Sequence, residues 1–122
     1  MRTIAKLGSG LLITAAMSFA LTYYHGQLVD AACYNQNPNM TQEKMWVKCA
    51  PTSSTTAFAI HANGKIRMLD QAGNDKVMTA MKRGDLKRDP NGDMPVVIDG
   101  YRHGKTIQVE GVRARGSNTS VH

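Results

Sequence analysis

Two cysteines are the residues of this chain best placed to react with each other. Cys33 and Cys49 are separated by fifteen residues. Redox pairs usually lie closer, as in Cys-x-x-Cys, so that one thiol can resolve the other. The wider spacing favours a structural disulfide that pins the intervening loop. We therefore predict a Cys33–Cys49 bridge, with a redox pair as the alternative.

Metal chemistry has some of the right residue types but not the right spacing. Four histidines and eight methionines could bind a soft metal such as copper. The histidines share no ligand spacing, and methionine is also a common filler of cores. Asp89-Pro-Asn-Gly-Asp93 is similar to the start of an EF-hand loop, but Gly100 stands where the bidentate glutamate is required. We predict no metal site and no cofactor.

Catalytic groups do not form a pattern either. An enzyme would place a base and a nucleophile, or two carboxylates, in one pocket. The serines and threonines cluster in loops with no histidine beside them in a known motif, and Glu43 and Glu110 are the only glutamates. We predict that the protein is not an enzyme and has no catalytic residues.

The N-terminal residues predict export. Arg2 and Lys6 precede an uncharged apolar run, and Ser18-Phe-Ala20 places small residues at both positions that a signal peptidase reads. We predict a signal peptide over residues 1–20, removed after Ala20, and a periplasmic or extracellular location, where disulfides form. The alternative is an uncleaved anchor, although the apolar run is shorter than the roughly 20 residues that span a bilayer.

The charge balance is moderately basic. The chain carries 15 Lys and Arg against 9 Asp and Glu. Two of the basic residues lie in the predicted signal peptide, so the remainder has 13 against 9, a net charge of +4. This excess suits contact with anionic polymers of a cell envelope and is small for a nucleic-acid-binding domain.

The remaining residues predict one small domain, 21–113, followed by a flexible polar tail, 114–122. Asn63-Gly64 is typical of a two-residue hairpin turn. Gly111 interrupts the alternation of its strand, which predicts a β-bulge. The predicted elements are strand Tyr23–Ala32, two helical turns Thr41–Lys48, strand Thr55–His61, strand Lys65–Asp70, helix Asp75–Arg83, strand Met94–His103 and strand Thr106–Arg113.

Two of these elements have a predicted orientation. The helix is expected to begin at Asn74 as its N-cap and to bury Val77, Ala80 and Met81. In strand Lys65–Asp70, alternation predicts that Ile66 and Met68 point inward. Five strands with one short helix between the third and fourth correspond to a small, partly open OB-like barrel, an all-β fold.

Several segments resemble small exported bacterial proteins of unassigned function. The first is Gly26-Gln-Leu-Val-Asp-Ala-Ala-Cys33, which fits the pattern Gly-x-Leu-Val-Asp-x-x-Cys. The resemblance implies an exported OB-like barrel and brings no known reaction or ligand. The other segments are Cys49–Thr52, Phe58–Ile60, Gly64–Asp70, Val96–Gly100 and Thr106–Glu110.

The predicted strand phases suggest one face for a ligand. OB-like barrels bind across one face of the sheet and the loops at its rim. The candidate residues would suit an anionic, partly planar ligand, such as a polysaccharide segment or an acidic protein loop. They are Lys65, Arg67, Tyr101, Arg102 and His103.

The predicted function is that of an exported binding or accessory module of the cell envelope. Its partner would be an envelope polymer or another protein, while nucleic acid is not expected. Contact with a membrane is expected only through an uncleaved signal segment. The alternative is a structural subunit that self-assembles through exposed strand edges.

Overall fold

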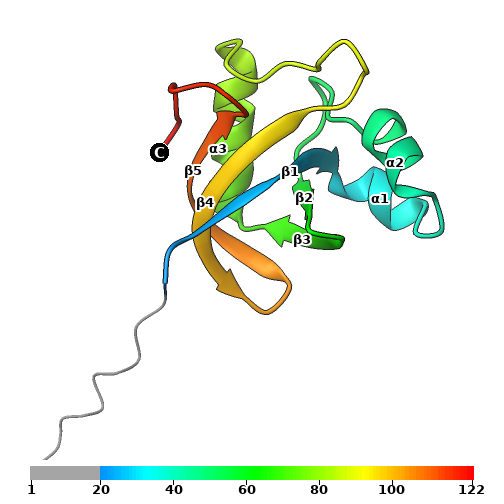
Figure 1. The fold of residues 1–122 in the computed structure, drawn as a ribbon, viewed down its shortest axis with the longest axis horizontal. Coiled ribbons are helices and arrows are strands. Elements are labelled where there is room, and N and C mark those ends of the chain that lie inside the picture. The colour runs from blue at the N-terminus through cyan, green and yellow to red at the C-terminus, as the bar shows by residue number, and fades with distance from the viewer. Residues whose placement is uncertain (1–19) are drawn as a thin grey trace, which may run out of the picture.

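The computed structural model describes residues 20–122, so the signal peptide predicted over 1–20 lies outside the described residues except for Ala20. In this part of the chain, no helix has the length and apolar character needed to cross a membrane. Figure 1 shows the order of the elements. They are β1 (Thr22–Asp30), α1 (Ala31–Gln36), α2 (Gln42–Lys48), β2 (Phe58–Ala62), β3 (Lys65–Leu69), α3 (Gln71–Lys82), β4 (Pro95–His103) and β5 (Thr106–Ala114).

The five predicted strands and the predicted helical turns at Thr41–Lys48 are confirmed, but the description as all-β with one short helix is wrong, because a further helix, α1, was not predicted. The segment between the cysteines folds into α1 and α2, so the described chain has three helices. The Asp30 carboxylate starts α1 by accepting the Cys33 amide at 3.0 Å. This N-cap converts what the sequence suggested was the end of a strand into the first turn of a helix.

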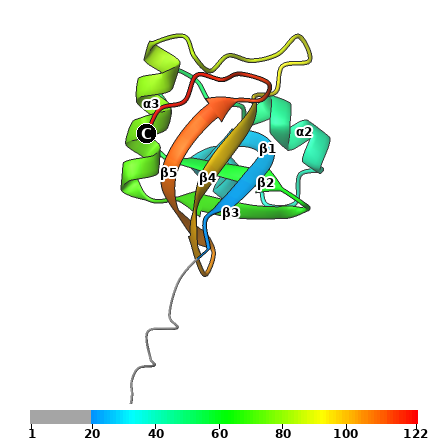
Figure 2. The same cartoon turned by 60° about the vertical axis from the view of Figure 1, so that its left-hand side comes forward.

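The strands form a closed but uneven ring in the order β1-β2-β3-β5-β4. The β4–β5 ladder is long and antiparallel, as are the ladders that β1 forms with β4 and β2. The ring closes between β3 and β5 through only two parallel pairs, Met68–Thr106 and Leu69–Ile107. Figure 2 shows α3, which follows β3 in the chain, lying alongside β5. The helix therefore spans the narrowest junction of the ring.

β1 belongs to two ladders and changes partner in its middle. It pairs with β4 over Thr22–Gln27 and with β2 over Gln27–Asp30. Gly26 lies at this corner, where a Cβ atom would overlap the carbonyl oxygen of His61. A strand can pass so close to its neighbour only because this residue has no side chain.

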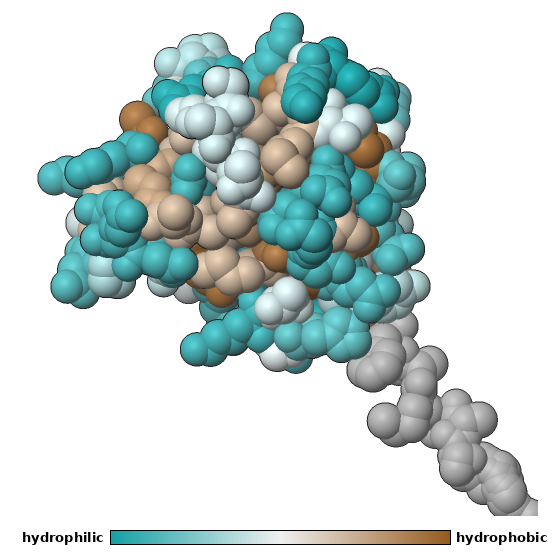
Figure 3. Space-filling model, turned by 180° about the vertical axis from the view of Figure 1, so that it is seen from behind, coloured by the Kyte–Doolittle hydropathy of each residue, from teal (hydrophilic) through white to brown (hydrophobic). Residues whose placement is uncertain are grey.

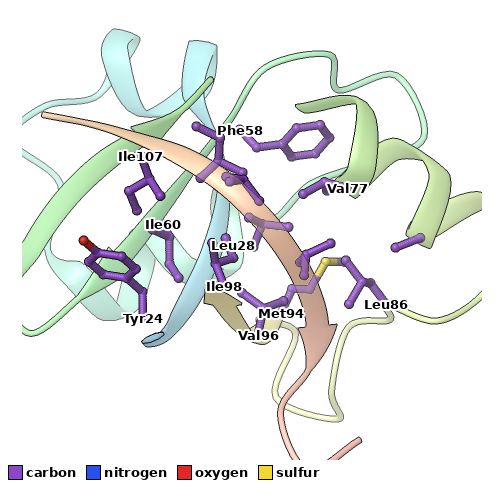
Figure 4. Packing of buried hydrophobic residues seen from close by; sticks show 14 of the residues in the cluster. Tyr24, Leu28, Phe58, Ile60, Val77, Leu86, Met94, Val96, Ile98 and Ile107 are labelled. Atoms are coloured by element: carbon purple, nitrogen blue, oxygen red, sulfur yellow. The ribbon is translucent and has the colours of Figure 1, made fainter. Parts of the chain in front are cut away.

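The barrel core is one apolar cluster with contributions from every strand and from α3. Leu28, Phe58, Ile60 and Ile98 are almost completely buried in it, and Figure 4 shows them with the residues around them. A second, smaller cluster lies between β1, β2 and the two N-terminal helices. Its buried members are Val29, Ala31, Met45, Cys49 and Ala59.

The predicted orientation of β3 is wrong. Ile66 and Met68 pack on the second cluster, beneath α1 and α2, whereas Leu69 belongs to the barrel core. The alternation of the strand is real, but a second apolar surface lies on its other face. Since both faces bury apolar side chains, the pattern alone could not identify the interior.

The predicted core face of α3 is confirmed, but its predicted N-cap is wrong. Val77 and Ala80 are fully buried, and Met81 packs against the same cluster. Asp70 is the N-cap, since its carboxylate accepts the Gly73 amide at 2.9 Å. Asn74 is buried one turn later.

The amide of Asn74 serves a different purpose. Its Oδ1 accepts the main-chain N–H of Phe58 at 3.0 Å. This bond fixes the beginning of β2 on the first turn of α3, which explains a buried asparagine in an otherwise apolar region.

The two predicted features of strand geometry are confirmed. Asn63 and Gly64 both have positive φ, 54° and 75°, as the hairpin turn requires. The β4–β5 register shifts between Asp99 and Gly100, leaving an extra residue before Gly111 in β5. The segment expected to be a flexible tail folds back, and Val121 exchanges two main-chain hydrogen bonds of 2.9 Å with Val112.

Candidate functional site

The disulfide that the sequence predicted is present. Cys33 in α1 bonds to Cys49 at the end of α2, with the Cα atoms 5.4 Å apart. Among the described residues there is no free cysteine. The same excursion is held at its base by Asp30, whose second carboxylate oxygen accepts the Thr55 hydroxyl at 2.7 Å. The connection between β1 and β2 is therefore held by the disulfide and by the hydrogen bond between Thr55 and Asp30.

One groove on the surface brings three separate segments together. It has a volume of about 560 Å³ and lies between α1, β3 and the end of the β4–β5 hairpin. Figure 1 shows these three elements on the same side of the ring. The lining residues are Tyr34, Asn35, Lys65, Ile66, Arg67, Met68, Arg102, Gly104 and Lys105.

This groove, which we call the basic groove, is strongly cationic. Lys65 and Arg67 come from β3, while Arg102 and Lys105 come from the β4–β5 hairpin. Among the described residues, 20–122, none of those that line the groove is acidic. Four cations around a depression of this size create a positive potential that attracts anions.

Arg67 packs against the protein and does not point freely into solvent. Its guanidinium carbon lies 5.5 Å from the centroid of the Tyr24 ring, and its side chain is half-buried. The phase of β3 explains this position: Ile66 and Met68 face the second cluster, so Arg67 takes the side of the barrel. A cation over an aromatic ring is a stabilising contact, which gives Arg67 a structural role besides its charge.

The five predicted ligand residues are only partly brought together. Lys65, Arg67 and Arg102 line the basic groove, whereas Tyr101 and His103 do not. His103 Nε2 lies 3.1 Å from the side-chain oxygen of Gln108, across the β4–β5 ladder. Tyr101 and His103 therefore lie outside the groove that the other three residues share.

Sequence reasoning missed six of the nine residues that line this groove, among them Tyr34, Asn35 and Lys105. Tyr34 and Asn35 reach it because α1 replaces the expected turn after Cys33. Lys105 reaches it because its carbonyl accepts the Met68 amide at 2.9 Å, which draws the hairpin end to β3. The position of Lys105 beside the turn glycine Gly104 was a usable signal for this groove, since the turn between two strands of a small barrel lies at the rim of the barrel.

A second polar region lies at the corner between β1, β2 and α2. The His61 ring is 5.7 Å from the Trp46 ring in an edge-on arrangement. Trp46 Nε1 and Gln27 Oε1 are buried nearby, and neither has a hydrogen-bond partner within residues 20–122. Burial lowers the pKa of His61, because the charged imidazolium would lose its hydration.

The depressed pKa of His61 predicts a pH-dependent stability. A histidine whose pKa is lower in the folded state favours folding only while it is neutral. The free energy of unfolding is therefore expected to fall as the pH drops below about 6.5 and through the folded pKa. Urea titrations of the wild type and of His61→Gln at pH 7.5 and 5 measure this. The variant should lose less stability between the two pH values; an equal loss would contradict the assignment.

Asp89 and Asp93 form a carboxylate pair in the loop before β4. The hydrogen bond from one carboxyl to the other raises the pKa of Asp93 and lowers that of Asp89. The positive charge of Arg115 opposes the rise in the pKa of Asp93. Across the described residues, no three His, Cys, Asp or Glu side chains come together as a metal site.

The exposed large hydrophobic residues do not gather into one patch that could serve as a second binding surface. Leu21, Tyr23 and Val47 are the large apolar residues exposed in the described chain, and Val47 lies on α2, away from the other two. Figure 3, which views the side opposite to that of Figure 1, shows a continuous tan area of moderately hydrophobic residues, with some brown ones, bordered by hydrophilic residues. Apolar atoms make up much of the surface of ordinary folded domains.

Comparisons with known proteins add no relative. No protein-family model matches the chain, and neither the curated proteins nor the solved structures contain a significant match. The resemblance to small exported bacterial proteins therefore stays a prediction, and function is argued from the geometry of the basic groove.

Proposed function

We propose that this protein is an exported binding module that holds a polyanionic ligand in the basic groove. The observation that carries the proposal is the convergence of Lys65, Arg67, Arg102 and Lys105 on one depression without a lining acid among the described residues. Such charges, brought from two distant segments, favour an extended anion that contacts several of them at once. The basic groove would therefore recognise its ligand through the negative charges that the ligand carries.

The arrangement of the strands supports an OB-like plan for this module. The ring runs β1-β2-β3-β5-β4, and α3 connects β3 to β4. OB-like barrels bind ligands across strands 2 and 3 and the loops that follow strands 1 and 4. The basic groove lies at β3, between the excursion after β1 and the turn after β4, which is the corresponding place.

Export is supported by the disulfide, because such bonds persist in oxidising compartments and are rare elsewhere. The alternative function, self-assembly through strand edges, has less support. A closed ring leaves little unpaired edge for a second copy.

Charge reversal at exposed groove residues tests the proposed function. Lys65→Glu combined with Lys105→Glu avoids Arg67, which packs on Tyr24, and both lysines are exposed. We expect this variant to lose about tenfold or more in affinity for polyglutamate and for a sulfated glycan fragment, because two attractions become repulsions. The loss is expected to shrink with added salt. Calorimetric titration of both probes provides the measurement.

A matched control separates the groove from the net charge of the protein. Lys82 and Lys87 are also exposed but lie at the end of α3 and in the following loop. Lys82→Glu with Lys87→Glu makes the same change in net charge. Equal losses in the two double variants, or no binding of either probe by the wild type, would refute the proposed function.

A further inference from the structure

β3 has an unpaired main-chain segment on the side of the basic groove. Its ladder to β2 covers Lys65–Met68, opposite Ala59–Ala62. Its ladder to β5 has only the pairs Met68–Thr106 and Leu69–Ile107. On this side, therefore, the part of β3 that lines the groove has no strand partner among the described residues.

The register indicates which main-chain groups face the groove. The amides of Met68 and Asp70 bind the carbonyls of Lys105 and Ile107 at 2.9 and 3.0 Å. In an extended strand, the N–H and C=O of every second residue point to the same side. The N–H and C=O of Ile66 consequently point toward the groove, as a donor and acceptor pair ready for another strand.

We infer that the basic groove binds an extended acidic segment of a protein partner, which adds to the edge of β3 at Ile66. This inference rests on the proposed function. A peptide in extended form supplies both an acceptor and a donor to Ile66, while its carboxylates reach Lys65, Arg102 and Lys105. A polysaccharide would satisfy the cations but does not carry the matching pair of main-chain groups.

The charges flanking this edge also select against a second copy of the chain. Lys65 and Arg67 lie on either side of Ile66, so two β3 edges in contact would bring like charges together. Charged side chains at an edge are a known means of preventing self-pairing. The edge therefore suits an acidic partner and repels the β3 edge of a second copy.

N-methylated peptides test strand addition without altering the protein. The probe is an octapeptide of alternating Glu and Thr, prepared unmodified, with all Glu amides methylated, or with all Thr amides methylated. Each methylated form blocks one edge of the extended peptide, because alternate amides point to opposite edges. We expect one methylated form to bind about tenfold more weakly than the unmodified peptide and the other to bind nearly as well.

Equal binding of the two methylated peptides would overturn the inference. If the sulfated glycan fragment still binds in a manner that depends on Lys65 and Lys105, the proposed function stands while the peptide assignment fails. If neither the glycan nor any peptide binds, both fail. A concentration-dependent dimer in sedimentation that the unmodified peptide does not dissociate would instead assign the edge to a second copy.

A variant of β3 provides an independent measurement on the side of the protein. Ile66→Pro removes the N–H that faces the groove and leaves the β2 ladder its own donors. We expect Ile66→Pro to lower the affinity for the unmodified peptide about tenfold and to leave the affinity for the glycan fragment unchanged. Ile66→Val should keep both affinities. A folded Ile66→Pro protein with unchanged peptide affinity would contradict the inference. If this variant does not fold, the methylated peptides decide.

Discussion

Gly26→Ala is expected to be among the most damaging conservative substitutions in the barrel, lowering the free energy of unfolding by about 3 kcal/mol or more. The added methyl group would overlap the main-chain carbonyl oxygen of His61 in β2. Main chain cannot move aside as a flexible side chain can. The corner of β1 must therefore open, which disturbs its ladders with both β2 and β4.

Equilibrium unfolding in urea measures this loss, and Gly116→Ala is the control. Gly116 has a φ of 83°, and no atom lies within 4 Å of the place that a methyl group would take. Its substitution therefore carries only the cost of a left-handed backbone, about 1 kcal/mol. A Gly26→Ala protein as stable as the Gly116→Ala protein would mean that β1 and β2 do not approach as closely as described.

Removing the disulfide is expected to be the second large change. Cys33 and Cys49 are sixteen positions apart, and opening a loop of this size costs about 3 kcal/mol. Cys49 is almost completely buried in the second apolar cluster. The double variant Cys33→Ala and Cys49→Ala therefore keeps apolar side chains at both positions, so that the result reports mainly on the crosslink.

The experiment compares the double variant with the reduced wild type, both against the oxidised wild type. Both are expected to unfold at lower denaturant concentration by a similar amount. Because α1 contributes Tyr34 and Asn35 to the basic groove, polyglutamate affinity should also fall in both. Free thiols in protein isolated from its native compartment, or an unchanged unfolding midpoint, would count against a structural bridge.

The sequence predicts the local features of this fold well where one physical signal acts alone. Asn63-Gly64 requires positive φ, and the turn forms there. Gly111 breaks a two-residue period, and the register shifts beside it. The pattern of Val77 and Ala80 identifies the buried face of α3. In each case neighbouring residues contain all the information that the prediction needs.

Predictions fail where two parts of the chain compete for one residue. Asn74 is a suitable N-cap by type, but Asp70 caps the helix and leaves Asn74 to the amide of Phe58. Ile66 could pack on either of two apolar surfaces by its place in the strand, and the position of α1 determines which one it contacts. The basic groove depends on the same long-range packing, which is why Tyr34 could not be assigned to it from spacing.

The placement of Asp70 has a consequence for how the ring stays shut. One carboxylate oxygen accepts both the Gly73 amide, at the start of α3, and the Val109 amide in β5, at 2.9 and 3.2 Å. The last residue before the helix is thus tied to the strand across the two-pair closure. Separating β3 from β5 therefore also breaks the bond from Asp70 to Val109 and disturbs the N-cap of α3. The narrow junction of the ring and the start of the helix are for this reason coupled, and loss of one weakens the other.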